Sequence, residues 1–448
     1  MLITESEAKA ICQKILGLVK ADDAQVSLNS SAQTHQRFAA NTFTTSGASA
    51  DTSVALTVWI GKKKGQSRTN DLSESALRTL VEQAEQMARI SPVDREYLPS
   101  LSAQSYRTTG GYTAVTERIT PASRAKAIAD ILAAGKKDSL QLAGLHFATD
   151  TATASATKNG NFFYDQKSSV SLSTTARTQT GDGSGYFLRS HFDAAKLDTQ
   201  QIARSAINKA LTARAPQPLD PGAYTVILEA QAVADLVPLL SASLDARSAE
   251  EGRSAFAAPG GKTRLGEKFF DERVNLFSDP MHAEVPATAA TAEGIPAEKT
   301  WLVRNGVIET LTHNRFWAQQ KSKAPTPGPV NLILTSATTP VTLQDIIANT
   351  ERGLLVSRFW YIRPVDQRTL TFTGLTRDGL WWIEGGKIKH PVRNFRFNQS
   401  VIEMLSAGVL DTIGVPERVS RGEGGGLPLF LPPLKIKRFH FSSQSDAV

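Results

Sequence analysis

Cysteine is almost absent from the sequence, and this scarcity limits the chemistry that the protein can perform. Cys12 is the only cysteine among 448 residues, so an internal disulfide and a cysteine-rich zinc site are both excluded. Cys12 lies in an apolar-periodic stretch that includes Ile11, Ile15 and Val19. We therefore expect it to be a buried core thiol and not a nucleophile.

Histidine is also scarce and widely spread. The seven histidines lie at positions 35, 146, 191, 282, 313, 390 and 440, and no two are within 20 residues of each other. A helical zinc-peptidase motif needs two histidines about four residues apart, so that both imidazoles share one helix face. Such a pair is excluded, and any metal site would need ligands from distant segments. We expect no catalytic or metal-ligating residue, and we single out His313, Arg315 and Trp317 as candidate peptide- or partner-binding residues.

Long apolar runs and strong charge are missing as well. No run approaches the ~18–20 apolar residues that span a bilayer, and the first residues lack the basic and long apolar segments of a signal peptide, so we expect a cytoplasmic protein without membrane contact. The net charge of +7 is small for this length, and the densest basic clusters, at 62–64 and 435–438, have no interleaved aromatic residues. Nucleic-acid binding is therefore not favoured.

What the sequence does contain is the pattern of an α+β fold in three parts. Residues 1–92 are predicted to form an N-terminal α/β region with a mixed sheet: a helix over 4–20 with Thr4 and Glu7 at capping-box spacing, a strand over 53–60 and a helix over about 71–90. Residues 93–220 are predicted to form a middle domain, in which a β-meander of about four strands over 139–192 lies between two helices.

Residues 221–448 are predicted to form a β-rich C-terminal domain. We expect helices at about 231–246 and 342–352, and turns at 377–379 and 385–386, where glycine recurs. The Gly- and Pro-rich tail over 414–434 is expected to cover a surface without adding an element.

Three segments resemble catalytic or phosphate-binding motifs, but each lacks a residue that the motif requires. The segment 259–263 ends like a phosphate-binding loop, but Phe256 occupies the position of the required first glycine. The segment 181–185 has Asp182 where a nucleophile elbow needs glycine, and 51–53 supplies only half of an aspartic-protease dyad. No complete catalytic constellation is present.

An ordered set of segments resembles the TldD/PmbA family, described as modulators of DNA gyrase and as metallopeptidases of the TldD/TldE type. The segments begin with Arg253-Ser254-Ala255-Phe256 and continue in the family's order, with a weaker match upstream at Arg37, Asn41 and 67–72. The others are 265–268, 274–280, 292–296, 301–307, 353–356, 379–388 and 391–392.

The chain departs from the catalytic branch of that family at the metal site. In TldD-like members a His-Glu-x-x-x-His motif lies on the helix before the Ser-Ala-Phe segment, and a cysteine near the C-terminus resembles a further ligand. Those positions fall near Val237, Pro238, Ala242 and Ser420 here. The resemblance therefore implies the TldE/PmbA-like branch: a non-catalytic subunit, without zinc of its own, of a heteromeric zinc metallopeptidase whose TldD-like partner carries the zinc and whose substrates are unfolded or short, extended peptides.

Alternatives remain open at this point. The chain could be an autonomous metallopeptidase with scattered ligands such as Asp279, His282 and His313. It could instead be a peptide-binding or gyrase-modulating protein without hydrolase activity, which would act without a partner enzyme.

Overall fold

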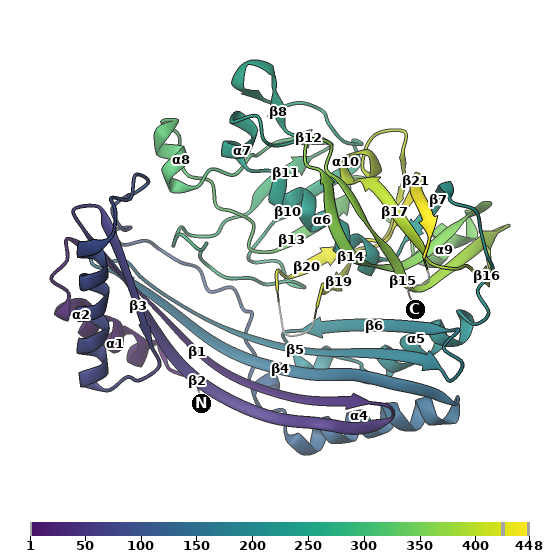
Figure 1. Ribbon diagram of the computed structural model, residues 1–448, viewed down its shortest axis with the longest axis horizontal. Helices are drawn as coiled ribbons and strands as arrows, with labels where there is room; N and C mark the ends of the chain where they lie inside the picture. The colour runs from purple at the N-terminus through teal and green to yellow at the C-terminus, as the bar shows by residue number, and fades with distance from the viewer. Residues whose placement is uncertain (1, 423–425, 446–448) are drawn as a thin grey trace.

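The computed structural model describes residues 2–422 and 426–445, which fold into two halves that face each other (Figure 1). The N-terminal half is a long, curved antiparallel sheet with helices at both ends, and the C-terminal half is rich in strands. The predicted α+β class is confirmed. No helix in the described ranges is long and apolar enough to cross a membrane.

One six-stranded sheet, ordered β3-β2-β1-β4-β5-β6, organises the N-terminal half. Its strands come from both sides of the predicted boundary at residue 92, and the three-domain division stays a prediction. The strands are β1 (Asp23–Ala39), β2 (Thr42–Ile60), β3 (Lys63–Thr69), β4 (Leu140–Thr157), β5 (Phe162–Thr178) and β6 (Ser184–His191). The helices are α1 (Glu5–Leu18), α2 (Glu74–Ile90), α3 (Ala114–Glu117), α4 (Pro121–Lys137) and α5 (Thr199–Thr212).

Side-chain alternation gives the two faces of this sheet different roles. Even-numbered residues of β4 pack under helices: Leu140 and Leu142 join the core of α4 and α5, while Ala154 and Ala156 join the core of α1 and α2. Odd-numbered residues, such as Thr149 and the others of that row, point to the opposite face because successive strand residues alternate. That second face looks toward the C-terminal half.

Local signals placed several of these elements correctly. The capping box of Thr4 and Glu7 is present at α1, and Cys12 is fully buried, so that burial raises the pKa of its thiol to about 12. The meander over 139–192 has three strands and not the predicted four, because β4 and β5 each run for 17 or more residues without a break.

The C-terminal half wraps two sheets around one buried helix, α6 (Ala230–Ser243). One sheet has the order β12-β11-β10-β13-β20-β19. In the other, β14 pairs with both β7 and β15, so the pairings β14-β7-β21-β17-β15 close into a ring lined by phenylalanines. Ten residues of α6 are buried, which makes this helix the centre of the largest core.

The remaining bounds complete the chain. The strands are β7 (Gly222–Leu228), β8 (Ala257–Ala258), β9 (Lys262–Thr263), β10 (Val274–Ser278), β11 (Thr300–Arg304), β12 (Val307–Ile308), β13 (Leu332–Ser336), β14 (Arg352–Asp366), β15 (Thr371–Glu384), β16 (Lys387–Pro391), β17 (Phe395–Ser400), β18 (Leu410–Ile413), β19 (Glu417–Val419), β20 (Leu429–Leu431) and β21 (Leu434–Gln444). The helices are α7 (Ala246–Glu250), α8 (Arg315–Gln320), α9 (Leu343–Ala348) and α10 (Val401–Met404).

Three predictions for this half were wrong in detail. The expected turn at 377–379 lies inside β15, where a register shift interrupts its pairing with β14. The tail over 414–434 contains β19 and β20, which complete a sheet, although 423–425 of that tail are outside the described residues. The helix predicted over 342–352 ends at Ala348, because the chain turns at Asn349 and enters β14.

Candidate functional site

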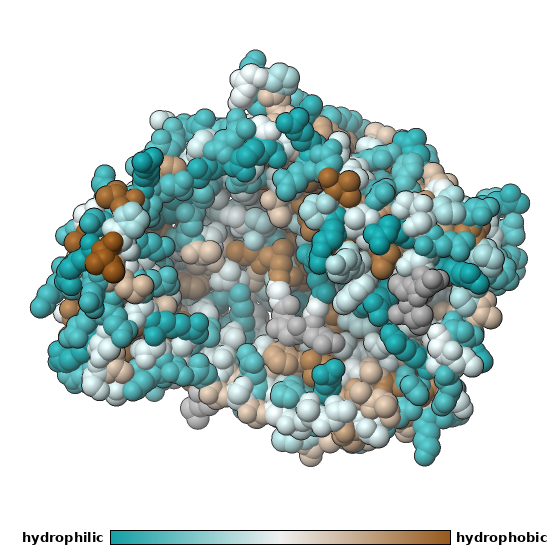
Figure 2. Space-filling model, in the orientation of Figure 1, coloured by the Kyte–Doolittle hydropathy of each residue, from teal (hydrophilic) through white to brown (hydrophobic). Residues whose placement is uncertain are grey.

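The largest cavity lies between the two halves, and it has a volume of about 1060 Å³. One wall is the face of β4 and β5 that carries Thr149, Thr151 and Ser169. The opposite wall is formed by α6 and by the segments around β19 and β20. Figure 2 shows the hollow between the halves, in the orientation of Figure 1.

Helix α6 presents no metal-binding side chains to this cavity. Pro238, Ser241 and Ala242 line the wall, whereas Val237 is fully buried in the core behind it. The apolar stripe expected from the sequence is confirmed, since the side chains of this row have no exposed surface: Val233, Leu236, Val237, Leu240 and Leu244. Zinc requires nitrogen, sulfur or carboxylate ligands. The residues at these positions therefore do not fit the zinc of the catalytic branch.

Ser420, near which the family resemblance places the cysteine of the catalytic branch, also lines the cavity and is hydrogen-bonded within the chain. Its hydroxyl lies 2.5 Å from that of Ser190 on β6, and its backbone carbonyl accepts a hydrogen bond from the Gln231 amide of α6. Ser420 thus connects the C-terminal half to β6 of the long sheet through a hydrogen bond.

The scattered ligands of the autonomous-enzyme alternative are not brought together. Among the residues in the described ranges, no group of three or more His, Cys, Asp and Glu side chains is arranged to hold a metal. The Asp279 carboxylate lies 3.7 Å from the Lys299 ammonium, and the His282 ring packs 4.9 Å from the ring of Phe430. His313 lies in a different cluster.

That cluster centres on Glu250, which sequence analysis did not single out. The Trp317 indole donates to Glu250 over 2.9 Å, and the Lys321 ammonium lies 2.9 Å from the same carboxylate oxygen. The buried His313 ring lies 3.9 Å from the other oxygen. Burial opposes the charge of Glu250, but its hydrogen bonds to Lys321 and Trp317 outweigh this and lower its pKa.

Two of the three residues predicted to bind a peptide or partner, His313 and Trp317, thus meet at one carboxylate, whereas Arg315 does not. The Arg315 guanidinium donates to the Pro99 carbonyl over 2.7 Å, and its backbone N–H donates to Glu293. None of the three lines the largest cavity. Their role in peptide or partner binding stays a prediction.

The cavity instead contains three cations that the sequence did not reveal: Lys167 on β5, Arg418 on β19, and Arg421 just beyond that strand. Arg418 donates to the backbone carbonyls of Ser190 and Glu284, and burial lowers the pKa of its guanidinium to about 10. The neighbouring His191 is buried and close to this cation, and both effects lower its pKa to about 4. His191 is therefore neutral at pH 7.

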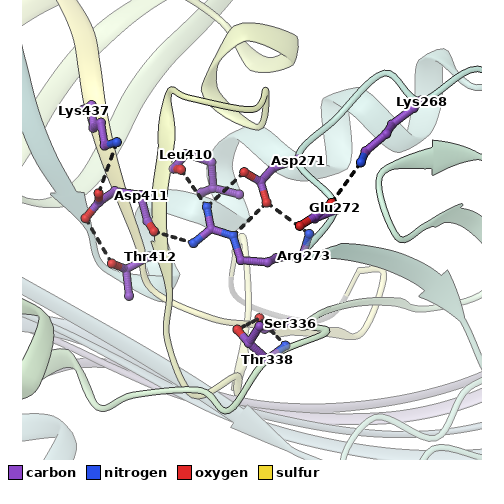
Figure 3. Close-up of polar contacts among 10 residues, drawn as sticks. All are labelled: Lys268, Asp271, Glu272, Arg273, Ser336, Thr338, Leu410, Asp411, Thr412 and Lys437. Atoms are coloured by element: carbon purple, nitrogen blue, oxygen red, sulfur yellow. Dashed lines mark hydrogen bonds and ion pairs between the residues drawn. The ribbon is translucent and has the colours of Figure 1, made fainter.

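Another partly buried arginine, Arg273, is paired with a carboxylate and can be compared with Arg418. Arg273 forms two bonds to the Asp271 carboxylate, at 2.7 and 2.9 Å, and also donates to the carbonyls of Leu410 and Asp411 (Figure 3). The contact with Asp271 raises the pKa of Arg273. Arg418 has the two carbonyl partners but no such carboxylate among the residues that the structure describes.

Family models match almost the whole chain. Domain 1 of the PmbA/TldA metallopeptidases matches residues 24–88, the central domain matches 69–214, and the C-terminal domain matches 221–442. The chain belongs to the PmbA/TldD family. No curated protein sequence matches it.

Solved structures share the fold over nearly the full length. TldE from Thermococcus kodakarensis is 15% identical with a TM-score of 0.84, and the match covers 97% of this chain and 99% of that one. A putative modulator of a DNA gyrase from Thermotoga maritima is 17% identical with the same TM-score, over 97% of this chain and 100% of that one. A putative modulator of DNA gyrase from Bacteroides thetaiotaomicron is 19% identical, again with a TM-score of 0.84, over 98% and 100%.

Proposed function

We propose that this chain is a non-catalytic, TldE-like subunit that pairs with a zinc-bearing, TldD-like metallopeptidase subunit, and that the pair hydrolyses unfolded or short peptides in the cytoplasm. The observation that carries the proposal is on helix α6, where the buried Val237 and the cavity-lining Pro238 and Ala242 occupy the positions that resemble those of zinc ligands in catalytic relatives. These side chains offer no donor to a metal, so the hydrolytic metal has to come from another chain.

The geometry of the cavity supports an extended peptide as the ligand of the pair. A peptide in extended form is held through its backbone groups, and the wall formed by β4 and β5 offers a row of hydroxyls, including Thr149, Thr151 and Ser169. A cavity of about 1060 Å³ is too small for a folded domain. Restriction to unfolded or short chains follows from that limit.

The relatives give independent support for the family activity and for the branch. The matching family models are those of metallopeptidases, and the structure of TldE from Thermococcus kodakarensis shares this fold. A partner chain of the TldD type is the component that such a TldE-like subunit requires.

Reconstitution with the TldD-like subunit of the same organism tests the proposal. Hydrolysis of an unfolded peptide is measured for this chain alone, for the partner alone, and for the two mixed at equal concentration. We expect no hydrolysis by this chain alone and full activity only in the mixture. Chelator-sensitive hydrolysis by the isolated chain would contradict the proposal, and so would a mixture that neither co-elutes nor cleaves.

The last outcome would favour the second candidate, a peptide-binding protein that acts without a partner enzyme. The gyrase alternative, suggested by the names of the Thermotoga and Bacteroides relatives, predicts instead that the isolated chain changes DNA supercoiling by purified gyrase.

A further inference from the structure

The described residues that line the largest cavity carry positive charge and no negative charge. Lys167, Arg418 and Arg421 line it, and no aspartate or glutamate does so in the described part of the chain. These cations come from both halves: Lys167 belongs to β5 of the long sheet, Arg418 lies on β19, and Arg421 lies just beyond β19. Positive potential is therefore focused into the space between the halves.

Arg418 is the most costly of the three to hold there. Its guanidinium is bonded only to neutral carbonyl groups, of Ser190 and Glu284, and it stacks 5.7 Å from the ring of Phe192. Removing a cation from water is unfavourable, and burial lowers the pKa of Arg418 for that reason, although the charge of Glu284 partly opposes the effect. An arriving anion would recover part of this cost.

The other two cations are also poorly neutralised. The Lys167 ammonium lies 3.9 Å from the Asp165 carboxylate, which is the outer limit of an ion pair, and burial lowers the pKa of this lysine. Arg421 is exposed at the cavity wall and has no carboxylate within 4.0 Å among the residues that the structure describes. Within the described ranges, neither cation forms a close ion pair, although Arg421 also stabilises the charged form of the buried Asp235 carboxylate.

A hydroxyl on the same wall lacks a partner. The Thr149 hydroxyl is buried and makes no hydrogen bond, although Thr149 lines the cavity. A buried polar group without a partner is rare in folded proteins and needs an explanation. A hydroxyl beside cations is the usual composition of a site for carboxylates, because both kinds of group donate hydrogen bonds to oxygen.

We propose that this cavity binds the carboxylates of an extended acidic peptide. The inference rests on the proposed function only in taking the cavity as the place where the chain meets a peptide. A peptide accounts for cations on both walls of a cavity of about 1060 Å³, which a single small anion would not fill. Carboxylates on successive residues of one chain can reach Lys167 on one wall and Arg418 or Arg421 on the other.

Binding to the isolated chain tests this inference without a partner and without hydrolysis. The probe is a short fluorescein-labelled peptide with several glutamates, compared with the same peptide in which glutamine replaces glutamate, each with a free or amidated C-terminus. We expect the glutamate peptide to bind about tenfold more tightly or better, with affinity that falls as salt rises. Weakening by amidation in addition to the glutamate preference would show that the C-terminal carboxylate also contributes, whereas weakening by amidation with equal affinity for the glutamate and glutamine peptides would overturn the inference.

Variants locate the site. Lys167→Met and Arg421→Gln should each remove most of the preference for glutamate, and circular dichroism checks that both variants fold. Lys126→Met removes the same charge from an exposed position on α4, where it pairs with Asp130, and should leave the preference unchanged. Equal affinity for the two peptides, or a preference that survives in both cavity variants, would overturn the inference.

Two further outcomes keep this inference separate from the proposed function. Stronger binding of duplex DNA than of the glutamate peptide, with the same loss in the Lys167 and Arg421 variants, would overturn the peptide and assign a nucleic acid. If the isolated chain prefers the glutamate peptide but cleavage with a TldD-like subunit fails, the inference holds and the proposed function falls. If cleavage succeeds and the two peptides bind equally, the proposed function holds and this inference falls.

Discussion

Arg273 and Arg418 both donate to two backbone carbonyls, yet only Arg273 also faces a carboxylate. Arg273 joins the loop before β10 to β18, and Asp271 neutralises it within the C-terminal half. Arg418 joins β19 to β6 across the boundary between the halves, at the edge of the cavity. Their pKa values move in opposite directions, raised for Arg273 by Asp271 and lowered for Arg418 by burial.

The presence or absence of a carboxylate partner distinguishes polar clusters that stabilise the fold from those that we expect to bind a ligand. The Glu250 cluster belongs with Arg273, because its cations and its indole N–H already share one carboxylate. The cavity cations belong with Arg418, because their charge is left for a ligand to balance. Substitution at the two kinds of site should therefore have different consequences.

The matched substitutions Arg273→Met and Arg418→Met should show the largest difference. Arg273→Met leaves the buried Asp271 carboxylate without its partner, so we expect the free energy of unfolding to fall by about 2–3 kcal/mol. Arg418→Met removes a cation that forms no ion pair within 4.0 Å in the described residues, and the expected loss is about 1 kcal/mol or less. Urea unfolding measures both, and equal losses would contradict the distinction.

The next effect concerns Glu250→Gln. The amide can still accept from Trp317 but no longer attracts Lys321, so we expect a loss of about 1–2 kcal/mol in unfolding free energy. Affinity for the glutamate peptide should stay unchanged, because Glu250 does not line the cavity. A stable variant with altered peptide affinity would move Glu250, His313 and Trp317 into the binding machinery.

Acidification tests the burial of His191 beside Arg418. Its pKa is about 4 in the folded protein and near 6.5 when unfolded, so between these pH values the unfolded chain binds the additional proton. Stability should therefore fall as the pH decreases from 7 to 5, by on the order of 1 kcal/mol from this residue. Thermal unfolding at the two pH values measures this. His191→Gln should show a smaller decrease than the wild type, and an identical decrease would contradict the assignment.

The smallest expected effect is that of Lys167→Met on stability. Its contact with Asp165 is long, and in the variant the buried Asp165 carboxylate keeps its hydrogen bonds to Thr288 and to the backbone of Gln166 and Ala289, so the free energy of unfolding should fall by no more than about 0.5 kcal/mol. The same unfolding experiment checks this value. A loss comparable with that of Arg273→Met would show that Lys167 serves the fold and not a ligand.

Local patterns in the sequence were sufficient for the elements that carry their own signals. Thr4 and Glu7 lie three residues apart and form the capping box of α1, and the apolar row of α6 follows helical spacing. The Asp378-Gly379 pair misled the prediction, because turn residues also form irregularities within strands. At Gly379, with φ of 133°, a Cβ atom would lie 2.1 Å from the Trp381 ring, so the strand accepts only glycine there.

The cavity was beyond the reach of local patterns. Arg418 and its acceptor Ser190 are 228 residues apart, and the segment around Arg418 contains no motif that distinguishes a binding arginine from a surface one. His313 drew attention because polar and aromatic residues surround it in the sequence. In the structure, His313 and Trp317 both contact the carboxylate of Glu250. Glu250 is distant from them in the sequence, so the local pattern did not include it.

The metal content of the purified, isolated chain tests the central claim most directly. After expression in zinc-containing medium and removal of loosely bound ions, elemental analysis should find far less than one zinc per chain, because Val237, Pro238 and Ala242 of α6 offer no donor to a metal. One tightly held zinc per chain, retained through dialysis against a weak chelator, would contradict the non-catalytic role.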